Sequence, residues 1–201
     1  QVPTDGDLYI FAVKDSALLD LVSRMSANRG LWVHTAGSMD MEVFAPYTAR
    51  YGVFYPMQTF SKERETDFDD IPIFVEANHT NDTERLQELA GRLSTKVYEA
   101  TSEQRKYLHL AAVFACNFTN HLYALCDRIL SEHGLPFETM LPLIRETAAK
   151  VADMPPAQAQ TGPAIRYDKN VIDKQMALLS DPTMRQIYDL MSRSIHETNK
   201  H

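Results

Sequence analysis

The sequence predicts an α/β domain with a doubly wound sheet, followed by an all-helical domain. Two observations lead to this prediction. Short apolar runs alternate with helical patterns as far as about residue 100, and this alternation is typical of α/β folds. From residue 101 onward the patterns are helical only. We therefore expect one domain over residues 1–100 and a second over residues 101–201.

Five short runs in the first half have the character of β-strands. The first of them is continuously apolar, as expected for a strand buried on both faces of a parallel sheet. We expect strands at residues 8–13, 31–35, 53–55, 71–77 and 96–101. Pro56 ends the third strand, because proline has no N–H group to donate to a neighbouring strand.

Three helical segments separate these strands. The first begins at Asp15 or Ser16 and ends by Gly30, and the last begins at Asn81 or Asp82. A short helix is expected between them over about residues 39–49. The residues expected to face the core from the first and last helices are Leu18, Leu19, Leu21, Val22, Met25, Leu86, Leu89, Ala90 and Leu93.

Four helices are expected in the second half, over about residues 102–133, 138–153, 168–180 and 182–198. Gly134 marks the end of the first and Pro136 precedes the second. Between the second and third, the stretch 154–168 contains prolines and a glycine, so we expect a loop there.

The composition excludes several classes of protein. The formal net charge is −7, which argues against a nucleic-acid partner, because such partners require a basic surface. The longest stretch without acidic or basic residues, 107–126, contains histidines and asparagines, so no membrane span is expected. Cys116 and Cys126 are too far apart on one helix to form a disulfide. Two unpaired cysteines indicate a reducing compartment, the cytoplasm.

The first strand predicts that part of the fold lies outside this sequence. At the edge of a sheet, the run "LYIFAV" at residues 8–13 would leave an open hydrophobic edge, which natural proteins avoid. The seven glycines also contain no G-x-G-x-x-G pattern, the fingerprint of a dinucleotide-binding turn. We therefore expect a first βαβ unit to precede these residues.

The long helix has one face that is polar but uncharged. On a helical wheel, His109, Asn117 and Asn120 lie on this face, and Leu110 and Phe114 lie on an opposite, apolar face that we expect to be core. A solvated face usually carries Lys and Glu, so the uncharged face indicates a cleft or a partner subunit. The alternative is that these polar groups only satisfy buried backbone groups. Histidine suits acid–base chemistry near neutral pH.

Four ordered motifs resemble a known family: "VHTAGS", "YGVFYPMQTFS", "YLHLAAVFACNFTNHL" and "TGPAIRYDKNVI". Together they resemble Rossmann-like proteins that carry the C-terminal domain of unknown function 2520. This family is similar in layout to pyrroline-5-carboxylate reductase, ketopantoate reductase and 6-phosphogluconate dehydrogenase. Ala36 and Tyr55 depart from the family pattern, which often has serine and histidine at these positions.

The resemblance implies a fold and a cofactor. The fold would be a partial Rossmann-like α/β domain that lacks its N-terminal βαβ unit, followed by an all-helical domain of the 6-phosphogluconate dehydrogenase C-terminal type. The cofactor would be NADP or NAD, whose fingerprint segment these residues lack. The helical domain would form a homodimer.

The expected ligand site lies where the strands end, because ligands of open α/β sheets bind beyond the carboxyl ends of the strands. By resemblance, the ribose and nicotinamide end of the dinucleotide would contact Val13, Lys14, His34, Thr35, Ala36, Gly37, Ser38, Tyr55 and Pro56. Glycine at position 37 permits close backbone approach. The alternative for residues 34–38 is an ordinary turn in which Ser38 caps a helix.

The remaining candidate residues concern the substrate. The proton donor would be His109, and Asn117 or Asn120 would orient the substrate. Residues 55–61 would form the wall on the far side of the nicotinamide, and Gln58 and Thr59 would bind the substrate. The alternative for this segment is a plain loop. Arg166 could bind a substrate carboxylate, or instead pair with Asp168 or another surface acid. No metal site is expected, because the histidines lack metal-ligand spacing.

Two functions are consistent with these expectations. The first is an NAD(P)-dependent oxidoreductase that transfers a hydride to or from a small carbonyl or imine substrate in the interdomain cleft. The alternative is a non-catalytic nucleotide-binding or dimerisation protein that retains the dehydrogenase architecture. The fold alone does not separate them.

Overall fold

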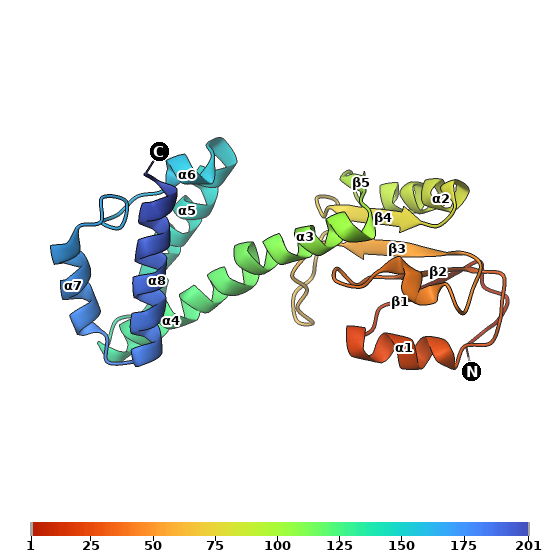
Figure 1. The fold of residues 1–201 in the computed structure, drawn as a ribbon, viewed down its shortest axis with the longest axis horizontal. Coiled ribbons are helices and arrows are strands. Elements are labelled where there is room, and N and C mark those ends of the chain that lie inside the picture. The colour runs from red at the N-terminus through yellow and green to blue at the C-terminus, as the bar shows by residue number, and fades with distance from the viewer. Residues whose placement is uncertain (1, 201) are drawn as a thin grey trace. The chain divides into compact units, whose positions relative to one another are not determined.

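The computed structural model of the protein describes residues 2–200, and its helices and strands are labelled in Figure 1. The chain divides into two compact units between Thr119 and Asn120. The predicted boundary near Ala100 coincides with the end of the sheet, because the last strand ends at Glu99. The helix that follows stays with the first unit because its N-terminus is hydrogen-bonded to the sheet.

The first unit contains five strands, as predicted. They are β1 (Leu8–Phe11), β2 (Leu31–His34), β3 (Tyr51–Pro56), β4 (Ile73–Ala77) and β5 (Val97–Glu99). The helical elements are α1 (Asp15–Ser23), the 3₁₀ turn η1 (Met41–Phe44), α2 (Thr80–Gly91), α3 (Ser102–Ala112) and the π-helical segment η2 (Val113–Phe118). The helix predicted over 39–49 is only the short turn η1, because Pro46 has no N–H to continue it.

The sheet has the order β1-β2-β3-β4-β5 and is mixed rather than wholly parallel. β1, β2 and β3 are parallel, β4 is antiparallel to β3, and β5 is parallel to β4. The prediction of a parallel sheet is therefore wrong at β4. A parallel connection usually needs a crossover helix, whereas the segment between β3 and β4 contains none.

Helices cover both faces of the sheet (Figure 1). On one face, α2 packs against a core of Leu31, Val33, Phe54, Ile73, Val75, Leu86 and Ala90. On the other, α1 and η1 pack against a core of Phe11, Leu18, Val22, Trp32, Phe44 and Tyr51. In β2, Leu31 and Val33 belong to the first core and Trp32 to the second, because successive side chains of a strand point to opposite faces of the sheet. The prediction that Leu19 and Leu93 face the core is wrong, because both are exposed.

β1 is an edge strand, and the prediction that it is buried on both faces is wrong. Ile10 is 50% exposed and Phe11 is the strand's one buried residue. β1 pairs only with β2 among the described strands. The strand therefore presents an open, partly apolar edge.

The helix predicted over residues 102–133 is made of three consecutive segments, α3, η2 and α4 (Thr119–Glu132). Its apolar face was expected to be core, and that prediction is wrong for the chain by itself. Leu110 is 53% exposed, Phe114 is 63% exposed and Phe118 is 51% exposed. An apolar stripe of this kind requires another surface to bury it.

The second unit is helical. After α4 it contains the turn η3 (Phe137–Met140), α5 (Leu141–Asp153), α6 (Pro156–Ala159), α7 (Lys169–Leu178) and α8 (Pro182–Thr198). The predicted helices are all present, and the predicted loop 154–168 contains the single-turn helix α6. Within residues 2–200, no helix has the length and apolar character needed to cross a bilayer.

Candidate active site

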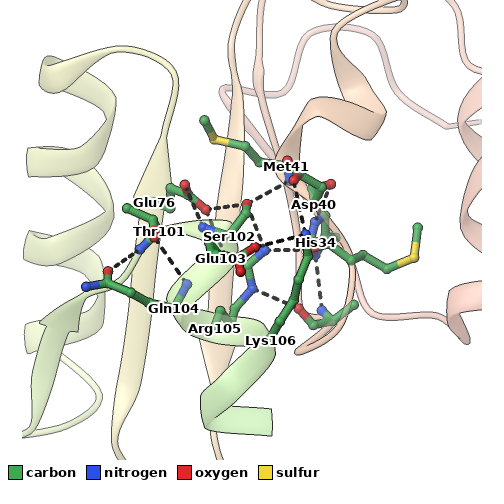
Figure 2. Close-up of polar contacts among 12 residues, drawn as sticks. His34, Asp40, Met41, Glu76, Thr101, Ser102, Glu103, Gln104, Arg105 and Lys106 are labelled. Atoms are coloured by element: carbon green, nitrogen blue, oxygen red, sulfur yellow. Dashed lines mark hydrogen bonds and ion pairs between the residues drawn. The ribbon is translucent and has the colours of Figure 1, made fainter. Parts of the chain in front are cut away.

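The N-terminus of α3 is fixed beside β4 by hydrogen bonds (Figure 2). The Thr101 hydroxyl accepts from the Gln104 amide at 3.2 Å, and the Gln104 side chain accepts from the Thr101 amide at 2.9 Å. Glu76, in β4, accepts from the Ser102 amide at 2.9 Å and from the Ser102 hydroxyl at 2.7 Å. The reciprocal bonds between Thr101 and Gln104 satisfy backbone amides that the start of a helix leaves free. The bonds to Glu76 attach this helix start to β4, so the helix begins at a defined position on the sheet.

The side chain of Arg105 joins α3 to two other parts of the unit. Its guanidinium donates to the Glu76 carboxylate at 2.8 Å and to the backbone oxygen of Ala36 at 3.2 Å. It also donates to the backbone oxygen of Met39. The side chain of Arg105 is 1% exposed and that of Glu76 is 14% exposed. A buried charge is tolerated only when it is paired and hydrogen-bonded. The carboxylate of β4 pairs with the guanidinium, and the backbone oxygens of the loop after β2 accept further hydrogen bonds from it.

The loop after β2 is also ordered by its own contacts. His34 is completely buried, and its Nδ1 atom accepts from the Ala36 amide at 3.1 Å. The Ser38 hydroxyl donates to the carboxylate of Asp15, the first residue of α1, at 2.5 Å. Ser38 therefore does not cap a helix here, since the cap of η1 is Asp40. These contacts fix the path of the loop between β2 and η1.

Gly37 brings this loop into contact with His109 and Tyr55. A Cβ atom at Gly37 would lie 2.6 Å from Nδ1 of His109 and 2.9 Å from the Tyr55 hydroxyl, so a larger residue would displace one of them. The Tyr55 hydroxyl lies 3.3 Å from Nδ1 of His109. Three segments that are far apart in the sequence therefore meet at one point.

A pocket of about 570 Å³ lies beside His109. Its polar lining residues are Tyr55, Gln58, Thr59, His109 and Asn117. The remaining lining residues are Met57, Phe60, Leu108, Ala111, Ala112, Ala115 and Cys116. Residues predicted separately for substrate binding and for catalysis thus surround the same cavity, and their roles there remain predictions.

The other residues predicted to contact a cofactor lie along the same edge of the sheet. Because β1, β2 and β3 are parallel, their carboxyl ends share one edge. Thr35, Ala36 and Pro56 are partly exposed at this edge. Val13 is 40% exposed, and Lys14 precedes α1. These residues are accessible, whereas the side chain of His34 is not.

Two predicted site residues belong to the second unit. Asn120 is exposed and does not line the pocket beside His109. The helical wheel that grouped Asn120 with His109 assumed a regular α-helix. The segment between them includes η2, which is π-helical and has a wider turn. Arg166 is exposed. Within residues 2–200 it forms no ion pair with Asp168, which caps α7 through the Val171 amide.

Residues 71–195 match the family model of the Domain of unknown function (DUF2520). This match covers more than half of the chain. The chain belongs to the DUF2520 family. No curated protein matches its sequence.

Solved structures share the fold of this DUF2520 protein. BF3122 of Bacteroides fragilis, an inferred NADP oxidoreductase, is 55% identical with a TM-score of 0.93, and the match covers 98% of this chain and 78% of that one. Protein TM1727 of Thermotoga maritima is 22% identical with a TM-score of 0.82, over 98% and 80% of the two chains. An imine reductase of Myxococcus stipitatus in complex with NADP⁺ is 16% identical with a TM-score of 0.64, over 98% and 76%. The fold is therefore that of Rossmann-like oxidoreductases.

Burial changes the acid–base behaviour of two residues in the candidate site of this DUF2520 protein. It lowers the pKa of His34 to about 4, and the nearby Arg105 charge contributes to this. It also raises the pKa of Tyr55 above that of free tyrosine. At neutral pH both side chains are therefore uncharged, and His34 holds the loop as a neutral acceptor.

Glu76 and Arg105 hold the candidate site together, and the sequence patterns did not predict them. The available signals were weak. Glu76 is the one charged residue in the predicted strand 71–77, and the pattern from Thr101 to Gln104 is typical of a capping box.

Within residues 2–200 there is no cluster of residues suited to bind a metal ion.

Replacing His34 with asparagine should reduce the acid sensitivity of folding. The folded-state pKa of His34 is about 4, compared with about 6.5 for an unfolded chain. Between these values the unfolded chain binds a proton that the folded chain does not, so stability is full above pH 6.5 and falls toward pH 4. The difference corresponds to roughly 3 kcal/mol. Urea unfolding near neutral pH and near pH 4.5 measures how much stability the wild-type protein and the His34→Asn variant lose on acidification.

The exposed His79 provides the control for this comparison. A His79→Asn variant should lose as much stability as the wild type on acidification. If His34→Asn also loses the same amount, the acid sensitivity comes from other groups.

Proposed function

We propose that this protein is an NAD(P)-dependent oxidoreductase that transfers a hydride to or from the carbonyl or imine carbon of a small molecule. The observation that carries the proposal is the meeting of Gly37, Tyr55 and His109 beside a pocket of about 570 Å³. This place is the carboxyl edge of the parallel strands, where α/β sheets bind ligands. The 55% identity with the inferred NADP oxidoreductase of Bacteroides fragilis supports the cofactor class.

The described residues fit the ribose and nicotinamide end of the cofactor. The buried Gly37 leaves no side chain between the loop and His109. The pocket lining contains no aspartate, glutamate, lysine or arginine, which suits the dihydronicotinamide ring of the reduced cofactor, because that ring carries no formal charge. The residues that would hold this end are Val13, Lys14, Thr35, Ala36, Gly37, Ser38, Tyr55 and Pro56, with the His34 side chain acting only through the loop. The G-x-G-x-x-G pattern is not among these residues, so they contribute only this end of the site.

When it is bound, a nicotinamide supplies or accepts the hydride. His109 would exchange the accompanying proton, because it lines the pocket and an imidazole can both accept and donate a proton. Asn117, Gln58 and Thr59 would orient the substrate through their amide and hydroxyl groups. In the second unit, Arg166 is proposed to bind a substrate carboxylate, and Asn120 is proposed as a further polar contact.

The helical unit is proposed to be of the 6-phosphogluconate dehydrogenase C-terminal type and to form a homodimer. In residues 120–200 the buried residues are Ala164, Ile172, Met184 and Ser192. Several large apolar side chains on its helices are instead exposed: Leu143 at 62%, Leu178 at 81% and Leu190 at 61%. Large apolar side chains that are exposed in one chain can be buried by a second copy, which supports the proposed dimer.

We also propose the kind of substrate and the location of the protein. The substrate would be a small molecule, since the pocket is of the size that binds one, and no role with nucleic acid or membranes is proposed. Cys116 and Cys126 are both free thiols, which supports a location in the reducing cytoplasm.

The full-length protein should bind NADPH or NADH, as measured by the change in nicotinamide fluorescence on titration. Once a carbonyl or imine substrate is found, His109→Asn should lower kcat by about 10²- to 10⁴-fold, because the variant cannot exchange the proton. Its affinity for the dinucleotide should change little. His133→Asn, at an exposed position of the second unit, is the matched control and should have wild-type kinetics.

Full-length protein that binds neither dinucleotide would contradict the proposed function. Binding without turnover across a panel of carbonyls and imines would instead favour a non-catalytic nucleotide-binding protein. Unchanged turnover in a folded His109→Asn variant would assign the proton to another donor.

The proposed dimer should be visible by sedimentation velocity at micromolar concentration, because obligate dimers bury more than about 2,000 Å². Leu190→Asp should shift the population toward monomer by placing a charge in the apolar surface of α8. Leu19→Asp, at a position that is 52% exposed on α1, should leave the dimer intact. A monomeric wild-type protein would contradict the proposal.

A further inference from the structure

The two nitrogens of the His109 imidazole have different surroundings. Nδ1 lies 3.3 Å from the Tyr55 hydroxyl. The backbone of Gly37 covers the same edge of the ring, since a Cβ there would lie 2.6 Å from Nδ1 and 2.8 Å from Cγ. His109 as a whole is nevertheless exposed and lines the pocket. The edge of the ring that neither Gly37 nor Tyr55 covers is the one that carries Nε2.

We propose that Tyr55 is a positioning residue that keeps the proton of neutral His109 on Nδ1, so that Nε2 exchanges protons with a ligand in the pocket. The Tyr55 oxygen accepts a hydrogen bond from Nδ1–H in both protonation states of the imidazole. In the cation, both nitrogens carry a proton. Transfer of the Nε2 proton to the oxygen or nitrogen of a reduced substrate leaves the neutral Nδ1–H form. The phenol keeps its own proton throughout.

Tyr55 has the properties that this role requires. Its side chain is held in β3, where Tyr55 is 9% exposed, and its ring packs against Phe74 with centroids 6.4 Å apart. The ring is edge-on to His109 at 6.4 Å and 67°. Burial raises the pKa of Tyr55, and the Arg105 charge offsets this only in part. The hydroxyl is therefore protonated and held in place at neutral pH, and its oxygen is able to accept a hydrogen bond from Nδ1–H.

The charged groups around the pair are bound to one another. Arg105, one turn earlier on α3, donates to Glu76 at 2.8 Å. Lys106 lies 3.7 Å from Asp40 and 3.6 Å from Glu103. The other titratable groups are the neutral, buried His34, Asp15 bound to Ser38, and the Cys116 thiol in the pocket lining. In the described part of the chain, Tyr55 is the hydrogen-bond partner of Nδ1.

The catalytic consequence rests on the proposed oxidoreductase function, whereas the position of the proton can be measured without a ligand. Long-range ¹H–¹⁵N NMR spectra of protein labelled with ¹⁵N-histidine distinguish Nδ1–H from Nε2–H. At about pH 9, where histidines are neutral, wild-type His109 should show the Nδ1–H pattern. In Tyr55→Phe the ring remains but the acceptor is lost, so the pattern should change to Nε2–H.

Tyr51→Phe is the matched control. Tyr51 is in the same strand and is also 9% exposed, and its hydroxyl lies 2.8 Å from Glu42 rather than near His109. This variant should leave the His109 pattern unchanged. Gly37→Ala is a second test, because its Cβ should push His109 away from Tyr55 and so lose the Nδ1–H pattern. Gly91→Ala has no atom within 4 Å of the added Cβ and should have no effect.

A wild-type spectrum with the proton on Nε2 would overturn the proposal, and so would an unchanged Nδ1–H pattern in folded Tyr55→Phe. If Tyr55→Phe does not fold, the wild-type spectrum and Gly37→Ala decide the question. With a substrate, Tyr55→Phe should lower kcat by about tenfold with KM unchanged, the loss of one hydrogen bond to a charged group. The expected spectra without any dinucleotide binding would remove the proposed function and leave the proton assignment intact.

Discussion

The buried guanidinium of Arg105 is the constraint on which the rest of the site depends. It is 1% exposed, and its contacts are the Glu76 carboxylate in β4 and the backbone oxygens of Ala36 and Met39 in the loop after β2. Leaving such a charge without partners costs several kcal/mol, so strand, loop and helix are held together. Because His109 follows Arg105 by about one turn of α3, the same contacts place its imidazole against Gly37.

Much of the fold could be predicted, because hydrophobic patterns and turn residues are local signals. β2 and β3 and the helices α7 and α8 lie close to their expected positions. The antiparallel direction of β4 could not be predicted, since it depends on whether the chain crosses the sheet between β3 and β4. The exposure of Leu110 and Phe114 could not be predicted either. An apolar stripe has the same pattern whether the same chain or another molecule buries it.

The meeting of the loop after β2 with Tyr55 could be predicted, because the carboxyl ends of parallel strands share an edge. The residues that hold the site together could not, since Glu76 and Arg105 resemble ordinary surface charges until the helix is placed on the sheet. Asn120 was grouped with His109 on an ideal wheel, whereas the segment between them includes the π-helical turn η2, which sequence patterns do not reveal. His34 was expected to contact a cofactor, yet its buried imidazole serves the loop backbone.

The most direct test of this account is a double-mutant cycle on the buried pair, with Glu76→Met, Arg105→Met and the combined variant compared by urea unfolding. Each single variant should lose about 3 kcal/mol or more, because it leaves one charge buried without its partner. The double variant should lose less than the sum, with an interaction energy of at least about 2 kcal/mol. Additive losses would contradict the claim that this pair holds strand, loop and helix together.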